Sequence, residues 1–261
     1  MLKSIFCLIA ARLLKISKRY IIIVKGNGAF GSVAFFVWRN LINVFEILGP
    51  AMVGPSSSHT AGAVRIGYIC GKLMGEKIIN ADIGLYGSFL LTGKGHGTPQ
   101  ALIAGLLGMQ PDDERIPKAF EIAEKEGLKF TVGEAKLKEA HPNSVLLKLK
   151  GKSGKSLEII GESIGGSIIN IAQIDGLPAN ISGDYPTLIA SNMDVPGMVA
   201  KVSAVLYEAN INIAQMHLYR ASRGKNSVLI AECDQEIPAE TIKEIADISG
   251  IVKVSYLSLE D

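Results

Sequence analysis

Hydrophobic periodicity divides most of the chain into helical and extended stretches. A helical run follows residue 60, with apolar residues three or four positions apart: Ala63, Ile66, Cys70 and Leu73. Gly75 ends that run. Residues 77–86 are β-branched at first and then alternate, which predicts a strand. A short helical turn and a glycine-rich loop are expected next, followed by helices over residues 99–108 and 116–127.

Past His141 the spacing of apolar residues changes to a period of two. The segments "SVLLKLK", "LEIIGES" and "SIINIAQIDG" each alternate, so they predict three antiparallel strands. Residues 176–186 are rich in Gly, Pro, Asn and Ser and are expected to form a linker. This linker would separate a first α/β domain, residues 43–175, from a second domain, residues 187–261.

The second domain shows the order strand, helix, strand, strand, helix, strand. The predicted strands cover 187–193, 211–221, 227–233 and 251–259, and the helices cover 198–209 and 238–248. This βαββαβ order is the ferredoxin-like pattern, an antiparallel sheet with both helices on one face. The sequence therefore predicts an α+β protein in which an α/β domain precedes a ferredoxin-like domain.

The composition is that of a folded protein without a strong charge bias. Of 261 residues, 48% are hydrophobic and 20% are charged, which is enough apolar material for two domain cores. The formal net charge of +2 gives no basic field, so no nucleic-acid partner is expected. Cys7, Cys70 and Cys233 lie far apart without a C-x-x-C pair, which excludes a disulfide framework and gives no metal motif. We expect a reducing, cytoplasmic location.

The start of the chain differs from the rest in charge. Residues 1–40 hold seven basic residues and no acidic residue. The apolar run near the start is too short for a membrane span, and charge follows it instead of a cleavage site. We expect residues 1–42 to be a basic extension before the folded protein, either a disordered arm or the product of a start codon assigned too far upstream. A basic segment on a membrane surface is the alternative.

A G-x-G-x-x-G pattern, formed by Gly26, Gly28 and Gly31, lies within this extension. A dinucleotide site would need a helix directly after the glycines and an acidic residue about 20 residues further on. The segment "SVAFFVW" that follows is β-branched and aromatic, and Glu46 comes too early. We therefore predict no nucleotide site there.

The stretch "GPSSSHTAG", residues 54–62, places five consecutive polar side chains at a helix start. One Ser or Thr suffices as a cap and contributes about 1 kcal/mol. The other hydroxyls are expected to be free for a ligand, with the unpaired N–H groups of the first turn: Ser56, Ser57, Ser58 and Thr60. Such a site suits a carboxylate, and His59 can exchange protons near neutral pH. The alternative is a heavily capped helix with a surface histidine.

A second polar motif precedes the next helix: Gly95, His96, Gly97 and Thr98. Its glycines allow a ligand or a partner to approach the backbone closely. If the fold brings the two helix entrances together, His59 and His96 form an acid–base pair beside an anion site. The alternative is a tight turn in which His96 forms only local hydrogen bonds.

Two long stretches carry a resemblance to known families. The segment "VFEILGPAMVGPSSSHTAGAVRIG", followed by "LYGSF" and "GKGHGT", resembles the β subunit of the two-subunit, iron–sulfur-dependent L-serine dehydratases. The segment "SNMDVPGMVAKVSAVLYEANINIAQM" resembles an ACT domain, a small regulatory module that binds amino acids. The resemblance covers residues 43–261. It departs from the family pattern at Gly93, where a larger residue is expected.

The first resemblance implies an activity and a set of site residues. The chain is expected to be one subunit of an L-serine ammonia-lyase, which converts L-serine into pyruvate and ammonia. His59 and His96 would be catalytic, and which of them takes the α-proton stays open. The implied substrate-binding residues are Ser56, Ser57, Ser58, Thr60, Gly95, Gly97 and Thr98.

A cofactor and a partner follow from the same resemblance. Enzymes of this family use a [4Fe–4S] cluster, whose open iron acts as a Lewis acid on the departing hydroxyl. Such a cluster needs three or four close thiolates, which three scattered cysteines cannot supply. The cluster is therefore expected on an iron–sulfur α subunit, and this chain alone is expected to be inactive and to hold no metal.

Regulatory residues are implied as well. "HPNS" and "GESIGGS" resemble parts of the allosteric-substrate-binding fold of serine dehydratases and of some phosphoglycerate dehydrogenases, which implies a ligand at His141, Asn143, Ser144, Gly165 and Gly166. Turn chemistry and a β-bulge are the alternative. The loop before the first ACT helix implies an amino-acid site at Asp194, Pro196 and Gly197, with Asp194 as the helix cap. An ACT domain that only forms dimers is the alternative there.

Two rival functions account for parts of the sequence. A non-catalytic amino-acid sensor explains the ACT domain but leaves His59 and His96 without a role. A single-chain pyridoxal-phosphate dehydratase needs a glycine loop around the phosphate, for which "GKGHGT" is a weak candidate. The β subunit of an L-serine dehydratase accounts for all the motifs and is the function that the sequence predicts.

Overall fold

The computed structural model describes residues 12–16, 19–23, 36–38, 51–220 and 226–259. The chain divides into two compact units, Met1–Ile47 and Leu48–Asp261. In the first unit, β1 (Arg12–Ile16), β2 (Arg19–Ile23) and β3 (Phe36–Trp38) form an antiparallel sheet in the order β1-β2-β3. The glycine pattern at 26–31 lies outside the described residues, and the expected disorder or upstream start of residues 1–42 stays a prediction.

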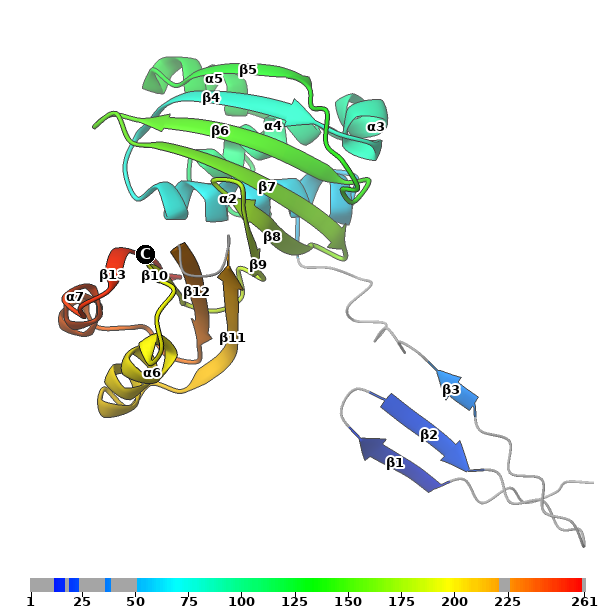
Figure 1. The fold of residues 1–261 in the computed structure, drawn as a ribbon. Coiled ribbons are helices and arrows are strands. Elements are labelled where there is room, and N and C mark those ends of the chain that lie inside the picture. The colour runs from blue at the N-terminus through cyan, green and yellow to red at the C-terminus, as the bar shows by residue number, and fades with distance from the viewer. Residues whose placement is uncertain (1–11, 17–18, 24–35, 39–50, 221–225, 260–261) are drawn as a thin grey trace, which may run out of the picture. The chain divides into compact units, whose positions relative to one another are not determined.

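The second unit begins with a mixed six-stranded sheet, visible in Figure 1. Its strands are β4 (Ile78–Leu85), β5 (Lys129–Glu134), β6 (Ser144–Gly151), β7 (Ser156–Gly165), β8 (Ile168–Ile174) and β9 (Leu177–Ile181). They lie in the order β5-β4-β6-β7-β8-β9. β5 runs parallel to β4, and the other neighbouring pairs are antiparallel. The three antiparallel strands predicted past residue 141 are thus confirmed.

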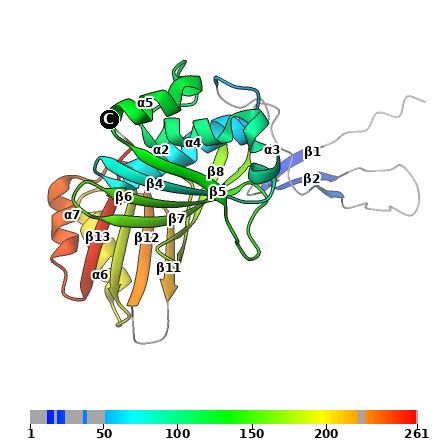
Figure 2. The same ribbon diagram turned by 90° about the horizontal axis from the view of Figure 1, so that it is seen from above.

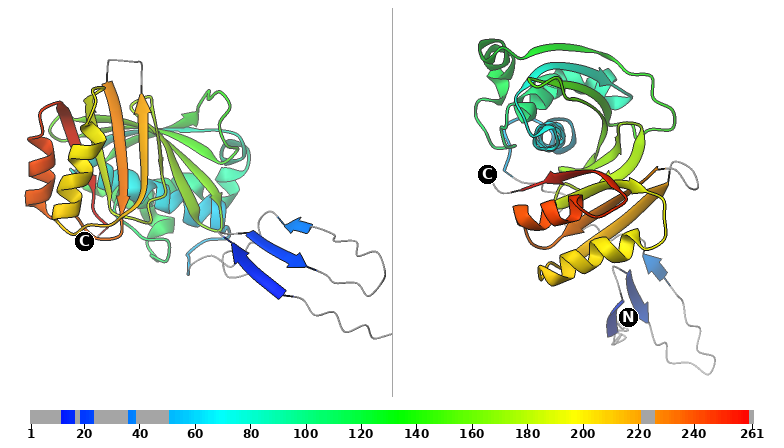
Figure 3. Two further views of the ribbon diagram at one scale, coloured as in Figure 1. Left: turned by 60° about the horizontal axis from the view of Figure 1, so that its bottom comes forward. Right: turned by 60° about the vertical axis from the view of Figure 1, so that its left-hand side comes forward.

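Helices cover one face of this sheet. They are η1 (Ser57–Ala61, a π-helical turn), α2 (Gly62–Met74), α3 (Ser88–His96), α4 (Thr98–Leu106), η2 (Ile116–Lys118) and α5 (Ala119–Glu126). Figure 2 shows α2, α4 and α5 together above the sheet, and the right-hand view of Figure 3 shows the sheet curving around its helices. One apolar core joins α2 and α4 to the sheet. None of the helices in the described residues is long and apolar enough to cross a membrane.

Helices α2 and α4 touch through two glycines. A Cβ atom at Gly105 would lie 2.1 Å from the carbonyl oxygen of Val64, and one at Gly67 would lie 2.3 Å from that of Leu102. A side chain at either position would force the helices apart, because close-packed interiors offer no space to absorb it. This contact holds the second half of α4 against the first half of α2, in the helices that follow the two polar motifs.

The C-terminal domain, residues 187–259, has the βαββαβ order that the sequence predicts. Its elements are β10 (Thr187–Met193), α6 (Met198–Glu208), β11 (Ile213–Arg220), β12 (Asn226–Cys233), α7 (Ala239–Ala246) and β13 (Ile251–Leu257). The strands form an antiparallel sheet in the order β11-β12-β10-β13. Both helices lie on one face, as the left-hand view of Figure 3 shows. The predicted ferredoxin-like domain is confirmed.

The two faces of this C-terminal sheet have different partners. Leu188 and Leu229 belong to the core that includes residues of α6 and α7, whereas Val228 and Ile230 belong to the core of the first domain. Alternate residues of a strand point to opposite faces, so the sheet packs on both sides. The carboxylate of Glu232 also accepts hydrogen bonds from the N–H and the hydroxyl of Ser182, at 2.9 and 2.7 Å.

Three segments differ from the sequence prediction. Helix α3 extends through "TGKGH", which was expected to be a glycine-rich loop. Strand β5, a short edge strand that is mostly exposed, is not among the strands predicted from the sequence. Strand β9 occupies residues 177–181 of the expected linker. Pro178 can lie in β9 because β9 is an edge strand, where a missing N–H leaves no ladder hydrogen bond unmade.

Candidate active site

The helix entrance at residues 56–62 is capped by Ser56. Its hydroxyl accepts a hydrogen bond from the backbone N–H of His59 at 3.0 Å. The N–H groups of Ser57 and Ser58 belong to the first turn, so they have no acceptor within the helix. The Ser57 hydroxyl forms no hydrogen bond within the described part of the chain. One hydroxyl and two N–H groups are therefore available for a ligand at this entrance.

Two threonines tie the entrance to the junction of α3 and α4. Thr60 Oγ1 donates to the carbonyl oxygen of His96 at 2.9 Å, and Thr98 Oγ1 donates to that of His59 at 2.8 Å. Both threonines are buried, with exposed fractions of 3% and 0%. Their hydroxyls hold the backbone, so the expectation that the Thr60 hydroxyl is free for a ligand is wrong.

The imidazole of His59 lies among three hydroxyl groups. Its Nδ1 is 3.0 Å from Ser58 Oγ. Its Nε2 is 3.0 Å from Ser88 Oγ and 3.1 Å from Thr92 Oγ1. The Thr92 hydroxyl donates its hydrogen to the Ser88 carbonyl oxygen at 2.9 Å, so it can only accept from His59. This donor count assigns the ring hydrogen to Nε2 and leaves Nδ1 as the acceptor for Ser58.

The second histidine lies beside the first. The ring centroids of His59 and His96 are 4.9 Å apart. Nδ1 of His96 donates to the Thr92 carbonyl oxygen at 3.0 Å, so Nε2 of a neutral His96 ring is an acceptor. Within the described residues that nitrogen has no hydrogen-bond partner. The structure thus brings together the two imidazoles that the sequence separates by a strand and a helix.

Burial and charge favour the neutral form of His59. Its pKa lies below the ordinary value of 6.5, first because of partial burial and then because of the charge of His96, while a hydrogen bond to the backbone of Ser88 opposes the shift. The ring of Phe89 contributes to this burial, edge to face with His59 at 5.3 Å between centroids. At neutral pH His59 is therefore uncharged.

The end of β7 closes one side of the site. Ser163 Oγ donates to the carbonyl oxygen of Ser58 at 2.9 Å. A Cβ atom at Gly62 would lie 2.2 Å from that same hydroxyl oxygen, so a side chain at position 62 would displace the Ser163 hydroxyl. The Asn143 side-chain amide donates in turn to the Ser163 carbonyl oxygen at 3.2 Å. Strand β7 is therefore held directly against the helix entrance.

The loop at residues 141–144, which the sequence assigns to a regulatory site, borders the same site. The carbonyl oxygen of Pro142 accepts a hydrogen bond from the N–H of Ser88 at 2.7 Å. Inside the loop, the Asn143 N–H donates to His141 Nδ1 at 3.2 Å, and the buried Ser144 hydroxyl donates to the His141 carbonyl oxygen at 2.5 Å. These side chains shape the loop, and the loop holds the start of α3.

Gly165 and Gly166 form the turn between β7 and β8, with φ of +120° and +59°. Positive φ is accessible to glycine at little cost, as the turn alternative expects. Ser167 follows them, and its hydroxyl donates to the carbonyl oxygen of Ser57 at 3.3 Å. The "GESIGGS" segment is thus another support of the helix entrance.

A hollow of about 250 Å³ opens beside His96. Its lining includes Gly95, His96 and Gly97, and a Cβ atom at either glycine would meet nothing within 4 Å. One water molecule needs a cavity volume of about 10–15 Å³, so the hollow has room for a molecule the size of an amino acid. Its described lining includes His96 but not His59, which makes His96 the histidine that faces the space.

The predicted amino-acid site of the C-terminal domain lies elsewhere, in the loop before α6. Asp194 does not cap α6: the N-cap is Gly197, with φ of +90° and no side-chain cap bond. The Asp194 carboxylate instead pairs with Arg220, at 2.9 Å from both Nε and Nη2. Pro196 is exposed in the same loop. A role of this loop in ligand binding stays a prediction.

The described residues of this chain do not fit an iron–sulfur cluster. They include no group of three His, Cys, Asp or Glu side chains that could hold a metal ion. Cys70 and Cys233 are buried free thiols, and burial raises the pKa of both. The pKa of Cys233 reaches about 11, first through burial and then through the charges of Asp234 and Glu232. Cluster ligands must be thiolates, so neither residue is suited to that role.

Three members of the site were missed by sequence reasoning: Ser88, Thr92 and Ser163. Ser88 and Thr92 lie four residues apart, so they share one face of a helix and can both reach His59. That spacing would have indicated the pair if the predicted helical turn had been extended through Thr92, as it is in α3. Ser163 gave no local signal, because its partner Ser58 is 105 residues away.

Two family descriptions match the chain. "Serine dehydratase beta chain" matches residues 42–130, and "ACT domain" matches residues 187–250. The first match includes both polar motifs and both histidines of the candidate site. The second covers most of the C-terminal domain, whose βαββαβ order agrees with it.

Curated relatives agree along most of the chain. It is 37% identical over 216 residues to a probable L-serine dehydratase, beta chain, of Bacillus subtilis (strain 168), covering 83% of this chain and 98% of the relative. It is 33% identical over 218 residues to an L-serine dehydratase, beta chain, of Peptoniphilus asaccharolyticus, with the same coverage of 83% and 98%. An L-serine dehydratase of Helicobacter pylori (strain J99) is 36% identical over 110 residues, 41% of this chain and 20% of that one.

Proposed function

The chain belongs to the family of L-serine dehydratase beta chains, and from this membership we propose that it is the beta subunit of an L-serine ammonia-lyase. The enzyme converts L-serine into pyruvate and ammonia, by loss of the α-proton and the β-hydroxyl and hydrolysis of the resulting aminoacrylate. The observation that carries the proposal is the pair of imidazoles, 4.9 Å apart, between a polar helix entrance and a hollow of amino-acid size.

The helix entrance is proposed to hold the carboxylate of L-serine. The free hydroxyl of Ser57 and the N–H groups of Ser57 and Ser58 are donors without an acceptor in the helix. The aligned peptide dipoles add partial positive charge at the same point. Thr60 and Thr98 then act as positioning residues, because their hydroxyls are occupied by backbone carbonyls.

His96 is proposed to take the α-proton at Nε2. This nitrogen is an acceptor without a partner in the described chain, and the ring lines the hollow. His59 has hydroxyl groups at both of its nitrogens, so it is less accessible to a substrate.

A [4Fe–4S] cluster is part of the proposal, held by an iron–sulfur α subunit. The lack of a ligand set among the described residues of this chain supports that division. The α subunit would cover the side of the site that this chain leaves open. Free thiols at Cys70 and Cys233 support a cytoplasmic location for the assembly.

Dimerisation through the C-terminal domain is also proposed. Strand β11 is an edge of the C-terminal sheet, so its outer N–H and C=O groups can pair with a second chain. Leu218 on this strand is 46% exposed. An edge strand with an exposed apolar side chain suits pairing between two copies.

The test is turnover by the assembled enzyme. Co-purified with a candidate α subunit, the wild-type chain is expected to form pyruvate from L-serine, and the chain alone is not. His96→Gln should lower kcat by about 10²–10⁴-fold, the range typical of a removed general base. Lys125→Gln, at an exposed residue of α5, is the control and should leave kcat unchanged.

Two further readouts separate the rivals. Binding of L-serine should survive His96→Gln, because the carboxylate contacts are elsewhere, while exchange of the α-hydrogen in D₂O should stop. Strong turnover by the isolated chain would reject the division between subunits. Serine binding combined with a kcat that His96→Gln does not alter would favour the amino-acid sensor.

A further inference from the structure

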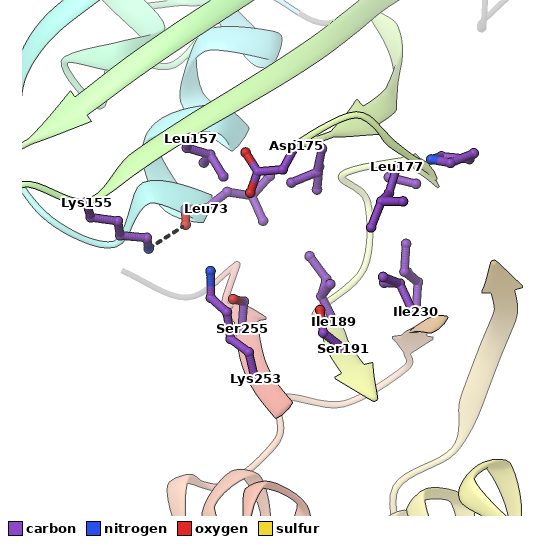
Figure 4. Close-up of a pocket in the computed structure, with 14 residues that line it drawn as sticks. Leu73, Lys155, Leu157, Asp175, Leu177, Ile189, Ser191, Ile230, Lys253 and Ser255 are labelled. Carbon is purple, nitrogen blue, oxygen red and sulfur yellow. Dashed lines mark hydrogen bonds between the residues drawn. The ribbon is translucent and has the colours of Figure 1, made fainter. Parts of the chain in front are cut away.

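A hollow of about 80 Å³ lies between the C-terminal sheet and the first domain, as Figure 4 shows. One water molecule needs a cavity volume of about 10–15 Å³, so this hollow can hold a ligand of several non-hydrogen atoms. The lining comes from the C-terminal end of α2, from β7 to β9, and from β10, β12 and β13. It includes neither histidine of the candidate active site and no residue of the loop before α6.

The floor of the hollow is two rows of residues across the C-terminal sheet. The strand registers align Val228 with Ser191 and Lys253, and Ile230 with Ile189 and Ser255. Each row is apolar on β12 and polar on β13. In Figure 4, Lys253 and Ser255 accordingly lie on one side of the hollow, and Ile230 lies on the other.

The roof repeats this division. Leu177 lies above Ile230 at the apolar end, and Lys155 lies on the side of Lys253 in Figure 4. The Lys155 ammonium already has acceptors, because it donates to the Met74 carbonyl oxygen at 2.6 Å at the end of α2. Asp175 also lines the roof, and its Oδ1 accepts a hydrogen bond from the N–H of Glu158 at 2.9 Å.

Three donors of the floor lack partners. In the part of the chain that the structure describes, the Lys253 ammonium and the hydroxyls of Ser191 and Ser255 form no hydrogen bond or ion pair. The two lysines outnumber Asp175, so the polar end is positively charged. An anion with oxygen acceptors would satisfy these donors, and a hydrocarbon chain would fit the apolar end.

We propose that this hollow binds a small aliphatic carboxylate. Its carboxylate group contacts Lys253 and the hydroxyls of the two floor serines, and its branched hydrocarbon chain lies between Leu177, Ile189 and Ile230. A free acid and an α-amino acid share this chemistry, since Asp175 offers an acceptor for an α-ammonium group. The site does not depend on the proposed enzymatic function, because it is formed by this chain alone.

Calorimetry on the full chain tests the proposal with three ligands of matched shape. L-Valine and 3-methylbutanoate carry the carboxylate, and 2-methylpropan-1-amine lacks it. Saturable binding of at least one of the acids, one per chain, and no binding of the amine is the expected result. The tighter of the two acids tells whether the α-ammonium group contributes. Binding of neither acid would overturn the proposal.

Two variants assign the binding to this hollow. Lys253→Met removes the ammonium group and keeps the length of the side chain, so it should weaken binding at least about tenfold. Lys201→Met is the matched control, because Lys201 is an exposed residue of α6, on the other face of the sheet. Ser191→Leu fills the floor and should abolish binding while the urea unfolding midpoint shows that the chain is folded. Unchanged affinity in both Lys253→Met and Ser191→Leu would place the ligand elsewhere and refute the assignment.

Discussion

Thr98 donates its hydroxyl hydrogen to the carbonyl oxygen of His59 over 2.8 Å, although the two residues are 39 positions apart. The Thr60 hydroxyl forms the reciprocal bond, to the carbonyl oxygen of His96. Thr60 follows His59 directly, and Thr98 lies two residues after His96. Each bond therefore joins the segment that carries one histidine to the backbone of the other histidine. Together they fix the separation of the two imidazoles, and their burial keeps water from replacing a lost partner.

Thr98→Val keeps the shape of the side chain and removes the donor. The His59 carbonyl oxygen would lose this hydrogen bond beside the buried residue 98, so the free energy of unfolding should fall by about 0.5–1.5 kcal/mol. Urea unfolding followed by circular dichroism measures this change. Thr98→Ser restores the hydroxyl and should recover most of the stability. A Thr98→Val chain as stable as the wild type would show that the bond does not hold the entrance.

Local patterns along the sequence predict much of this fold. The run that starts after residue 60 and stops at Gly75 is α2, whose last turn ends with Gly75 in the left-handed region, at φ of +67°. Alternation past residue 141 predicts β6, β7 and β8, whose side chains are buried on one face. In these segments the local signal and the tertiary environment favour the same structure.

Where tertiary contacts decide, the sequence pattern fails. Glycines at positions 93 and 95 indicate a loop, yet α3 is helical there: Gly93 is buried, with its Cβ position 3.0 Å from Thr98 Cβ. Strand β9 contains Pro178 and Asn180, which favour a linker, but pairing with β8 gives it an extended backbone. The candidate site depends on contacts such as Ser163 with Ser58, which no local pattern encodes.

The lowered pKa of His59 predicts a pH dependence of stability. Because the folded pKa lies below 6.5, the unfolded chain binds more protons in the window just under pH 6.5. The contribution of His59 to the free energy of unfolding is therefore fully present above that window and decreases as pH falls through it. Urea unfolding at several pH values measures the slope. The His59→Gln variant lacks the titrating group, so its slope in this window should be smaller; an equal slope would contradict the assignment.

The neighbouring imidazole contributes to that shift, which His96→Gln tests directly. Removing His96 removes the charge that disfavours protonation of His59, so the pKa of His59 should rise toward its ordinary value. Titration of the His59 ring protons by NMR, in the wild type and in His96→Gln, gives both values without any need for activity. His217→Gln serves as the control and should leave the His59 pKa unchanged. A His59 pKa that is unchanged or lower in His96→Gln would contradict the coupling.

At the contact of α2 and α4, replacement of glycine by alanine is expected to change the stability of the chain very differently at two positions. Gly105→Ala places a methyl group 2.1 Å from the Val64 carbonyl oxygen, so it should destabilise the chain by about 1–3 kcal/mol, typical of overpacking. Gly71→Ala is the matched control on α2, because its nearest contact is an ordinary 3.5 Å. Its higher helix propensity should make it neutral or stabilising by about 0.5–1 kcal/mol. Equal effects of the two variants in urea unfolding would argue against the close approach.

The contact of Gly62 with Ser163 predicts a coupling between two substitutions. Gly62 has φ of −62°, so alanine is allowed by the backbone, and any cost of Gly62→Ala comes from the Ser163 hydroxyl oxygen 2.2 Å away. Ser163→Ala alone loses the bond to the Ser58 carbonyl oxygen, at about 0.5–1.5 kcal/mol. In the double variant the nearest atom is the Cβ of residue 163, at 3.0 Å, so the two methyl groups fit with a small shift.

The double variant should therefore be destabilised by less than the sum of the single variants, with a coupling of about 0.5–3 kcal/mol, the range for residues in contact. Urea unfolding of the four proteins completes the cycle. Gly133→Ala provides the control, because its Cβ meets nothing within 4 Å, and its effect should add to that of Ser163→Ala. Strict additivity of Gly62→Ala and Ser163→Ala would mean that Ser163 of β7 does not contact the helix entrance. Strand β7 would then not form one side of the candidate site.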